Sequence, residues 1–477
     1  MEPSLELSPS AFQSLAERVT ALATRWLAEL DGRAIAPSTT GAATEALYAG
    51  PLPEAGLGAA ALDDLEAWMK HSRAQNGRFL GYVLGSGEPV GALADLITSV
   101  VNQNVTAWRS GPSSVSLERA LIRELAAGLG CQGFAGYTTG GGSASNLMGL
   151  AMAREAMAPA NEDGAAPGVI YASTEVHMSI PKALALLGLG RKNLRPVAVD
   201  DAWRMRPEAL ASAIAEDLRA GKRPLAVVAT AGTVSTGAVD PLPGIAEIAR
   251  RHGLWFHIDG AYGGLAALAV PGQFEGMALA DSISLDAHKW LYQAVDCGLL
   301  LYRSREAARR TFSNSGDYVV TASRDPVEGF AFFDESLELS RRARALKLWL
   351  SLRYHGLGAF RQAIRRDLEN ARTLAESVRA QPELELIAPP TLSAVCFRYG
   401  GEVPEPERDA FNARLQAQLN ARGRVYLSNA TLHGRYALRA CFVNHRTRPE
   451  DVAAIVPEVL SAAAALRQGE DAGPSRK

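Results

Sequence analysis

Residues Ser284–Gln293 read "SLDAHKWLYQ" and place a histidine and a lysine side by side, shortly after an aspartate. The residues before it, "ADSISL" (280–285), are typical of a buried strand. Lys289 therefore stands at a strand end, where a lysine can reach into a cleft without full exposure. Partial burial disfavours the charged form of an amine, so this lysine is a candidate for chemistry.

Strand-like and helix-like stretches alternate around this segment. A helical stretch such as "DPLPGIAEIARRHG" (240–253) separates apolar runs of strand length, and the alternation predicts an α/β domain with a mainly parallel sheet covered on both faces. Ligands bind beyond the carboxyl ends of such strands, which is where Thr230, Asp259 and Lys289 fall. The other apolar runs are "GVIYAS" (168–173), "RPLAVVATAG" (223–232), "LWFHIDG" (254–260) and "GLLLYR" (298–303).

The flanking regions predict three further parts. Residues 1–85 read as an N-terminal helical segment with loop-like stretches such as 36–56, and 86–355 as the large α/β domain. Residues 356–466 read as a smaller C-terminal α/β domain, and 467–477 as a disordered tail. Within the long helical pattern over 341–381, Gly356 and Gly358 predict a break.

Composition excludes several classes of protein. The 477 residues carry a formal charge of -2, with 47% hydrophobic and 21% charged residues, which is typical of a soluble globular protein and gives no electrostatic reason for nucleic acid or an anionic membrane. No run of about 18 apolar residues and no signal peptide is evident. Four cysteines without a CxxC pair argue against a zinc site and favour a reducing cytoplasm. We therefore expect a cytoplasmic protein with no metal site.

A glycine- and serine-rich turn, "TTGGGSASN" (138–146), leads into the helical stretch "LMGLAMAREAMA" (147–158). Glycines let a backbone approach an anion, and a helix N-terminus offers free N–H groups with a partial positive charge. The turn matches neither GxxxxGK[ST] nor GxGxxG. It fits a phosphate-binding turn and, equally, a flexible turn capped by serine.

Three single residues complete the set of candidates. In "HIDGAYGG" (257–264), Asp259 follows an apolar strand, and a buried carboxylate needs a partner such as a protonated ring nitrogen, or caps the next turn. In "STEVHMSIPKALALLG" (173–188), His177 precedes a helix. Its ring either stacks on a flat cofactor or has a purely structural role. Lys289 fits a Schiff-base lysine or a salt-bridged one.

Taken together, a phosphate turn, a stacking ring, a carboxylate for a pyridinium and a Schiff-base lysine are the needs of pyridoxal phosphate. Their order resembles the fold-type I pyridoxal phosphate enzymes. "DAHKW", "HIDGAYGG", "TTGGGSASN" and "STEVHMS" are similar to the group II amino-acid decarboxylases, as are "GYVLGSGEPVGALADLITSVVNQN" (81–104) and "SRRARALKLW" (340–349). The resemblance spans roughly residues 65–460.

The resemblance implies roles at the cofactor. Lys289 would hold pyridoxal phosphate as a Schiff base, and Asp259 would pair with its pyridine nitrogen. Ala261 would pack on one face of the ring and His177 on the other.

The resemblance also implies contacts with the rest of the cofactor and with the substrate. Ala144 and Ser145 would bind the phosphate with His288 nearby, and Thr230 would lie near the 3-hydroxyl. The residues that match the family's substrate pocket and active-site arginine are Phe79, Tyr82 and Arg439.

One position departs from the animal enzymes, in which a loop tyrosine is the proton donor. Counted back without gaps from "SRRARALK", that tyrosine falls on Phe332, and the loop's own tyrosine is Tyr318. In plant relatives a phenylalanine at this place goes with aldehyde synthesis, in which oxygen intercepts the quinonoid.

The resemblance thus predicts decarboxylation of an L-amino acid, most simply an aromatic one, to its amine. Three alternatives stay open: an aromatic aldehyde synthase, a decarboxylase of glutamate or another acidic amino acid, and a catalytically silent binder of the cofactor. By the same resemblance we expect a homodimer with active sites at the interface.

Overall fold

The structure is a computed structural model that describes residues 5–314 and 325–469. Across these ranges no helix combines the length and the apolar character that crossing a membrane requires. The helices are α1 Pro9–Glu29, α2 Gly41–Ala46, α3 Asp64–Lys70, α4 Pro89–Val101, α5 Pro112–Gly128, α6 Gly142–Met157, α7 Ser179–Leu186, α8 Pro207–Arg219, α9 Leu242–Arg251, α10 Ala287–Trp290, α11 Arg305–Phe312, α12 Ala345–Arg379, α13 Arg408–Arg422, α14 Pro449–Ala453 and α15 Ile455–Arg467.

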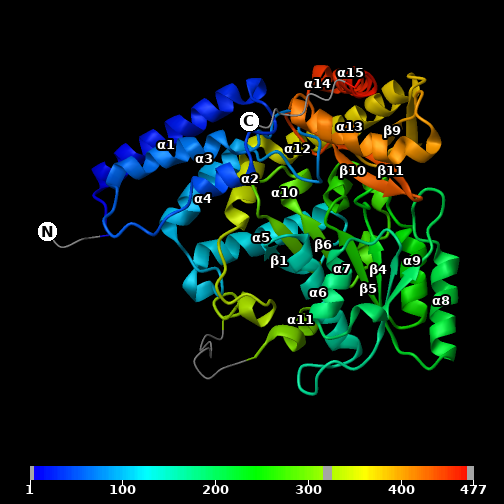
Figure 1. The fold of residues 1–477 in the computed structure, drawn as a ribbon. Coiled ribbons are helices and arrows are strands. Elements are labelled where there is room, and N and C mark those ends of the chain that lie inside the picture. The colour runs from blue at the N-terminus through cyan, green and yellow to red at the C-terminus, as the bar shows by residue number, and fades with distance from the viewer. Residues whose placement is uncertain (1–4, 315–324, 470–477) are drawn as a thin grey trace.

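A seven-stranded sheet forms the centre of the chain (Figure 1). Its strands, in spatial order, are β1 Ala135–Thr139, β7 Gly298–Tyr302, β6 Ser282–Asp286, β5 Trp255–Gly260, β4 Pro224–Thr230, β2 Val169–Ser173 and β3 Leu194–Val197. Only β7 runs antiparallel to its neighbours; the pairs from β6 to β3 are parallel. The predicted α/β fold with a mainly parallel sheet is confirmed, and the carboxyl ends of β4, β5 and β6 share one edge.

Helices cover this sheet on both faces. Helix α6 packs across β4, β5, β6 and β7, while α9 packs on β4 and β5 from the opposite side. The strands are buried along nearly their whole length, as their uninterrupted apolar character predicts.

A second, antiparallel sheet of four strands lies above the first in Figure 1 and packs against α12 and α13. Its strands, in order, are β10 Ser428–Leu432, β11 Arg435–Cys441, β9 Ala394–Tyr399 and β8 Leu384–Ala388. Helix α12 connects the two sheets and is interrupted at Gly356, whose φ of 76° and ψ of 148° are not helical. The predicted break is therefore real at Gly356, whereas Gly358 continues the helix.

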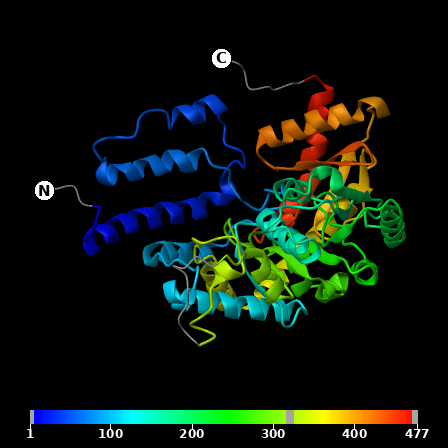
Figure 2. The same cartoon turned by 90° about the horizontal axis from the view of Figure 1, so that it is seen from below.

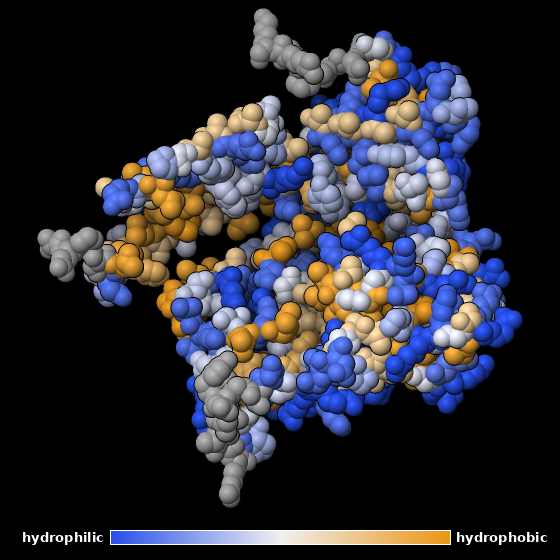
Figure 3. Space-filling view, turned by 60° about the horizontal axis from the view of Figure 1, so that its bottom comes forward, coloured by the Kyte–Doolittle hydropathy of each residue, from blue (hydrophilic) through white to orange (hydrophobic). Residues whose placement is uncertain are grey.

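Helices α1, α2 and α3 form an arm that projects from the body, whereas Phe79 and Leu80 are buried and α4 packs along α12 (Figure 2). Hydrophobic surface lines the underside of this arm in Figure 3. The stretch 36–56, expected to be a loop, contains the short helix α2, which Thr40 caps by accepting from Ala43 N at 3.2 Å. The exposed apolar side chains of α1 and α4 are Phe12, Val19, Leu27, Leu93, Leu96, Ile97, Val100 and Val101.

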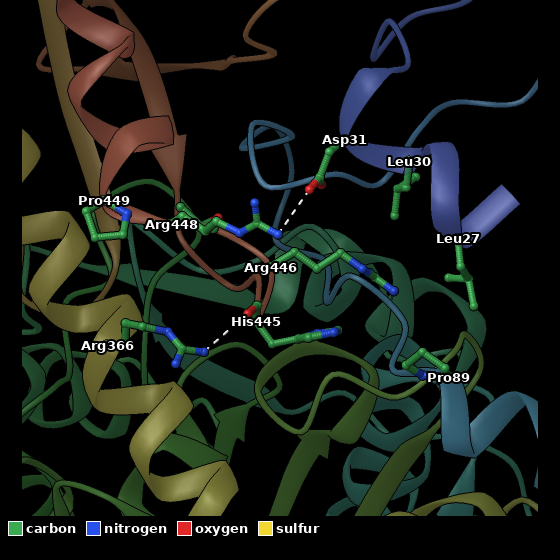
Figure 4. A pocket seen from close by; sticks show the side chains of 10 residues that line it. Leu27, Leu30, Asp31, Pro89, Arg366, His445, Arg446, Arg448 and Pro449 are labelled. Carbon is green, nitrogen blue, oxygen red and sulfur yellow. Dashed lines mark hydrogen bonds and ion pairs between the residues drawn. The ribbon is translucent and has the colours of Figure 1, made fainter. Parts of the chain in front are cut away.

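The base of the arm meets the C-terminal helices at a cavity of about 550 Å³ (Figure 4). Arg448 pairs with Asp31 at 3.0 Å, and Arg366 donates to the backbone oxygen of His445 at 3.2 Å. The ion pair links Asp31, just after α1, to Arg448, just before α14, and both side chains are more than half exposed.

All four cysteines are free and buried. Burial raises the pKa of Cys131 to about 11 and of Cys297 and Cys396 to about 12, and it also raises that of Cys441. These thiols are therefore packed as small apolar groups.

A fully buried ion pair gives a test of the core. Arg341 Nη2 lies 2.7 Å from Glu118 Oε1, and neither side chain is exposed. We expect Arg341→Met to lower the free energy of unfolding by about 3–5 kcal/mol, because it leaves a carboxylate buried without its cation. Chemical denaturation measures this loss. The neighbouring Arg342→Met, which removes a half-exposed pair with Asp95, is the control and should change stability by less than about 1 kcal/mol.

Candidate active site

Asp259 lies at the carboxyl end of β5, next to its last residue, and its carboxylate accepts three hydrogen bonds. Oδ1 accepts from Ala261 N and Ser284 Oγ, both at 3.1 Å, and Oδ2 accepts from Asn146 Nδ2 at 3.0 Å. The side chain is buried at the edge where β4, β5 and β6 end. A carboxylate held by three donors can face a cationic group of a ligand.

Lys289 lies one helical turn beyond the end of β6. Its Nζ is 2.9 Å from Asp286 Oδ2, and the side chain is 18% exposed, so the amine reaches the cavity from a mostly buried stem. His288 lies 3.5 Å from the same oxygen through Nε2, while its Nδ1 accepts from Cys297 N at 3.2 Å. Burial lowers the pKa of His288. Asp286 thus stands between the two basic side chains.

The glycine-rich turn joins β1 to α6. Gly141 has a φ of 126°, which glycine adopts readily. A Cβ on Gly142 would lie 2.6 Å from Ala261 Cβ and 2.9 Å from Asp286 Oδ2, so only glycine fits there. The turn therefore brings backbone and the N-terminus of a 16-residue helix up to the cavity.

His177 lies two residues before α7 and lines the same cavity. Its Nδ1 lies 2.8 Å from Ser179 Oγ and accepts from Ser179 N at 3.3 Å. Burial lowers the pKa of His177, which favours the neutral ring.

These groups surround one cavity of about 300 Å³. Of the residues predicted from the sequence, the cavity is lined by Thr230, Asp259, Ala261, His177, His288 and Lys289. Gly140–Ser143 and Asn146 also line it and belong to the glycine-rich turn that the sequence predicts to bind phosphate. Sequence reasoning missed the remaining lining residues, namely Glu175, Gly232, Val234, Tyr262, Asp286 and Val295. Asp286 could have been found from the sequence, because it stands at the same strand end as Lys289. Nothing in the sequence singles out Asn146 or Glu175 beyond their place in the motifs quoted above.

Ala144 and Ser145 lie one step behind the cavity. Both backbone amides donate to Gly141 O at 3.0 Å, and the Ser145 hydroxyl lies 2.8 Å from Thr139 Oγ1. The backbone amides of Gly142 and Ser143, the first two residues of α6, do not take part in these bonds to Gly141 O.

The three predicted substrate residues do not line this cavity. Phe79 and Tyr82 form a cluster with Tyr426, whose ring stacks on Phe79 at 5.1 Å and whose hydroxyl lies 3.1 Å from that of Tyr82. Arg439 is buried and donates to the backbone oxygen of Val234, which does line the cavity. Arg439 therefore supports the wall from behind.

Phe332 lies in the core and does not line the cavity. It is 1% exposed, packs edge-on against Phe330 and Tyr137, and the guanidinium carbon of Arg341 lies 4.2 Å from its ring centre. Tyr318 lies outside the described residues.

The cavity fits pyridoxal phosphate by its own chemistry. It offers an amine, a carboxylate supplied with donors, an imidazole and a glycine turn at a helix N-terminus. Two buried atoms at the cavity, Thr230 Oγ1 and Asp286 Oδ1, have no hydrogen-bond partner among the described residues. Unpaired buried atoms of this kind are expected where a polar ligand completes the site. Sheet order and cavity together define a fold-type I pyridoxal-phosphate enzyme.

Comparison with known proteins identifies the family. Residues 68–400 match the pyridoxal-dependent decarboxylase conserved domain. The aromatic-L-amino-acid decarboxylase of Bacillus atrophaeus is 35% identical over 395 residues, 81% of each chain, and the L-2,4-diaminobutyrate decarboxylase of Rhizobium meliloti (strain 1021) is 33% identical over 424 residues, 86% of this chain and 83% of that one. The solved structure of Rhodiola rosea 4-hydroxyphenylacetaldehyde synthase superposes with a TM-score of 0.87 at 26% identity, covering 96% of this chain and 99% of that one. The chain belongs to the pyridoxal-dependent decarboxylase family and is a pyridoxal-phosphate-dependent amino-acid carboxy-lyase.

Proposed function

We propose that this chain decarboxylates an aromatic L-amino acid to the corresponding amine in the cytoplasm. The observation that carries the proposal is the meeting of Lys289, Asp259 and His177 around one cavity. The aromatic substrate is supported by the similarity to the Bacillus atrophaeus enzyme.

Pyridoxal phosphate, when bound, supplies an electron sink for the pair of electrons left as carbon dioxide departs. Lys289 would hold the cofactor covalently, and Asp259 would keep a positive ring nitrogen beside its carboxylate. His177 and Ala261 would enclose the ring from opposite sides, with Thr230 Oγ1 free to bond the ring hydroxyl.

The phosphate would lie at the start of α6. The free amides of Gly142 and Ser143 and the side chain of His288 face that place, with Ala144 and Ser145 behind them. Asp286 would balance the charge of Lys289 before the cofactor is attached.

A panel of the twenty amino acids tests the substrate and the product together. We expect carbon dioxide and amine in equal amounts from an aromatic amino acid, with little peroxide. Release of carbon dioxide from non-aromatic amino acids alone would contradict the proposed substrate class, and peroxide in equal amount with carbon dioxide would contradict the amine.

The placement of Phe332 supports the amine as the main product. Because Phe332 is packed under Arg341 and away from this cavity, we expect Phe332→Tyr to leave the ratio of amine to aldehyde unchanged within about twofold. The added hydroxyl would instead destabilise the chain by about 1–3 kcal/mol, as expected for a buried polar group without a partner. A shift of product from aldehyde to amine would instead place Phe332 at the proton-donor position.

A second candidate substrate carries a cationic side chain, as in L-2,4-diaminobutyrate. Glu175 lines the cavity, and burial raises the pKa of its carboxyl because no strong cation compensates it. An ammonium group on the substrate would supply that partner. The same panel separates the candidates, and Glu175→Gln should weaken binding of the diamino acid alone.

We further propose that the chain works as a homodimer assembled through the arm and the neighbouring helix α4. Ile97 and Val101 are more than half exposed on α4, on a surface too apolar for solvent. We expect Ile97→Asp with Val101→Asp to weaken dimerisation by more than about 30-fold, the size of an interface hot spot. Analytical ultracentrifugation with activity measured across the same concentrations tests this.

The control for the arm is Leu218→Asp, which puts the same charge on an exposed leucine of α8. This variant should remain a dimer. A wild-type chain that is monomeric and fully active at low concentration would show that the arm serves another purpose.

A further inference from the structure

Asn146 joins Asp259, which lines the cavity, to Ser179, the hydrogen-bond partner of His177, and both polar atoms of its side-chain amide take part in the network. It is buried on α6, where Nδ2 donates to Asp259 Oδ2 at 3.0 Å and to Ser179 Oγ at 2.9 Å, while Oδ1 lies 2.9 Å from His257 Nε2. A carboxylate accepts and does not donate. The NH₂ group of Asn146 must therefore face Asp259, and its oxygen must face His257.

The far end of this network fixes the same direction. Trp255 Nε1, which can only donate, bonds Ser282 Oγ at 2.9 Å, and Ser282 Oγ lies 2.8 Å from His257 Nδ1. Burial lowers the pKa of His257 to about 4, so the ring is neutral and keeps one proton. That proton lies on Nε2, where Asn146 accepts it. Each hydrogen bond in this network therefore points, from donor to acceptor, in the direction from the Trp255 indole to Asp259.

The hydrogen bonds that lead from Asn146 through Ser179 to His177 have their direction fixed by the same network. Because Ser179 Oγ accepts from Asn146, its own proton is free to point at His177 Nδ1, 2.8 Å away. The backbone amide of Ser179 also donates to that nitrogen. Nδ1 therefore presents its lone pair to two donors, and the proton of the neutral ring lies on Nε2.

We propose that Asn146, acting through Ser179, is a positioning residue that holds His177 as the Nε2–H tautomer, so that His177 offers the cavity a hydrogen-bond donor and no base. A donor at this place suits an anionic group such as the carboxylate of an amino acid. A lone pair at the same place could remove the α-proton of the substrate and open side reactions in which no carbon dioxide leaves. The network would therefore favour loss of carbon dioxide over removal of the α-proton. This consequence rests on the proposed function, whereas the assignment of the tautomer does not.

The tautomer is read by ¹⁵N NMR of the purified protein labelled only at histidine. The signals of His177 are assigned by their absence from His177→Gln. In the wild type near neutral pH we expect Nδ1 at the shift of an unprotonated nitrogen and Nε2 at that of a protonated one. A protonated Nδ1, alone or together with Nε2, overturns the proposal.

Three variants test the role of Asn146. Ser179→Ala leaves the backbone amide of residue 179 as the one remaining donor to Nδ1, so Ser179→Ala and Asn146→Leu should each lower the share of the Nε2–H tautomer. Ser179→Thr, which keeps the hydroxyl, should keep the wild-type share. Ser284→Ala is the matched control, since it removes a donor to Asp259 Oδ1 and leaves the branch to His177 intact. Wild-type shifts in both Ser179→Ala and Asn146→Leu would show that Asn146 does not hold the tautomer.

The chemical consequence is read in deuterium oxide from the amino acid recovered after partial conversion. The wild type should return it without deuterium at the α-carbon, and the ratio of exchange to carbon dioxide should rise several-fold in Ser179→Ala and Asn146→Leu. Exchange by the wild type as fast as its release of carbon dioxide contradicts the effect on reaction choice. If no amino acid loses carbon dioxide while the wild-type shifts are as stated, the proposed function fails and the tautomer assignment stands.

Discussion

Lys289→Ala is expected to abolish turnover and covalent attachment of the cofactor while leaving the fold intact. The side chain is mostly buried and pairs with Asp286, and it is the amine that reaches the cavity beside Asp259 and His177. Losing a group that acts on the reacting atoms lowers turnover by more than about 100-fold. Activity measures the loss of turnover, and absorbance of the bound cofactor with borohydride reduction and peptide mapping measures the loss of covalent attachment. Thermal unfolding checks that the fold is intact.

The control is Lys182→Ala, since Lys182 lies on α7 near His177 without lining the cavity. This variant should keep its labelled peptide at Lys289. Borohydride labelling of a lysine other than Lys289 in the wild type would refute the assignment, and so would a Lys289→Ala protein that still turns over at the wild-type rate.

Asp259→Asn is expected to lower turnover by roughly 10²–10³-fold, the range for losing one key electrostatic group. Asparagine has nearly the same shape and keeps one accepting oxygen, so part of the bonding to Ser284 and Asn146 survives while the negative charge is lost. Steady-state kinetics measures the loss, and thermal unfolding checks the fold.

Asp240→Asn is the matched control for this substitution. Asp240 is equally buried, accepts from the amides of Thr230 and Met205, and lies outside the cavity lining, while burial raises the pKa of its carboxyl to about 6. We expect this variant to lose stability rather than turnover. Near wild-type turnover in Asp259→Asn would show that the carboxylate does not support the cofactor ring.

The elements around the cavity could be predicted because their pattern is local. Buried parallel strands are apolar along their whole length, so the strands that end at Thr230, Asp259 and Asp286 stand out in the sequence. The break at Gly356 could be predicted for the same reason, since a position with a positive φ is most readily occupied by glycine.

Contacts between distant segments could not be read in this way. Asn146 meets Asp259 and His257 only because α6 crosses the sheet above β5, more than a hundred positions later in the chain. The strand Ala135–Thr139 was hidden too, because its threonines and glycine resemble the turn that follows it.

Phe332 illustrates the limit of matching by count. A gapless count carries the position of a catalytic tyrosine onto this residue, yet the side chain packs between Tyr137, Phe330 and Arg341. Counting preserves order along the chain, whereas the direction of a side chain depends on what packs around it.

The burial of the four thiols has a consequence for handling and for study. Mild oxidants and alkylating reagents act on accessible thiolates, and in this chain each sulfur is buried inside a core of the fold. Cys131 and Cys297 lie in the core of the large sheet, Cys396 beneath the small one, and Cys441 between them. The folded protein therefore needs no reductant to stay intact, and the order in which its sulfurs become reactive in denaturant would record which layer opens first.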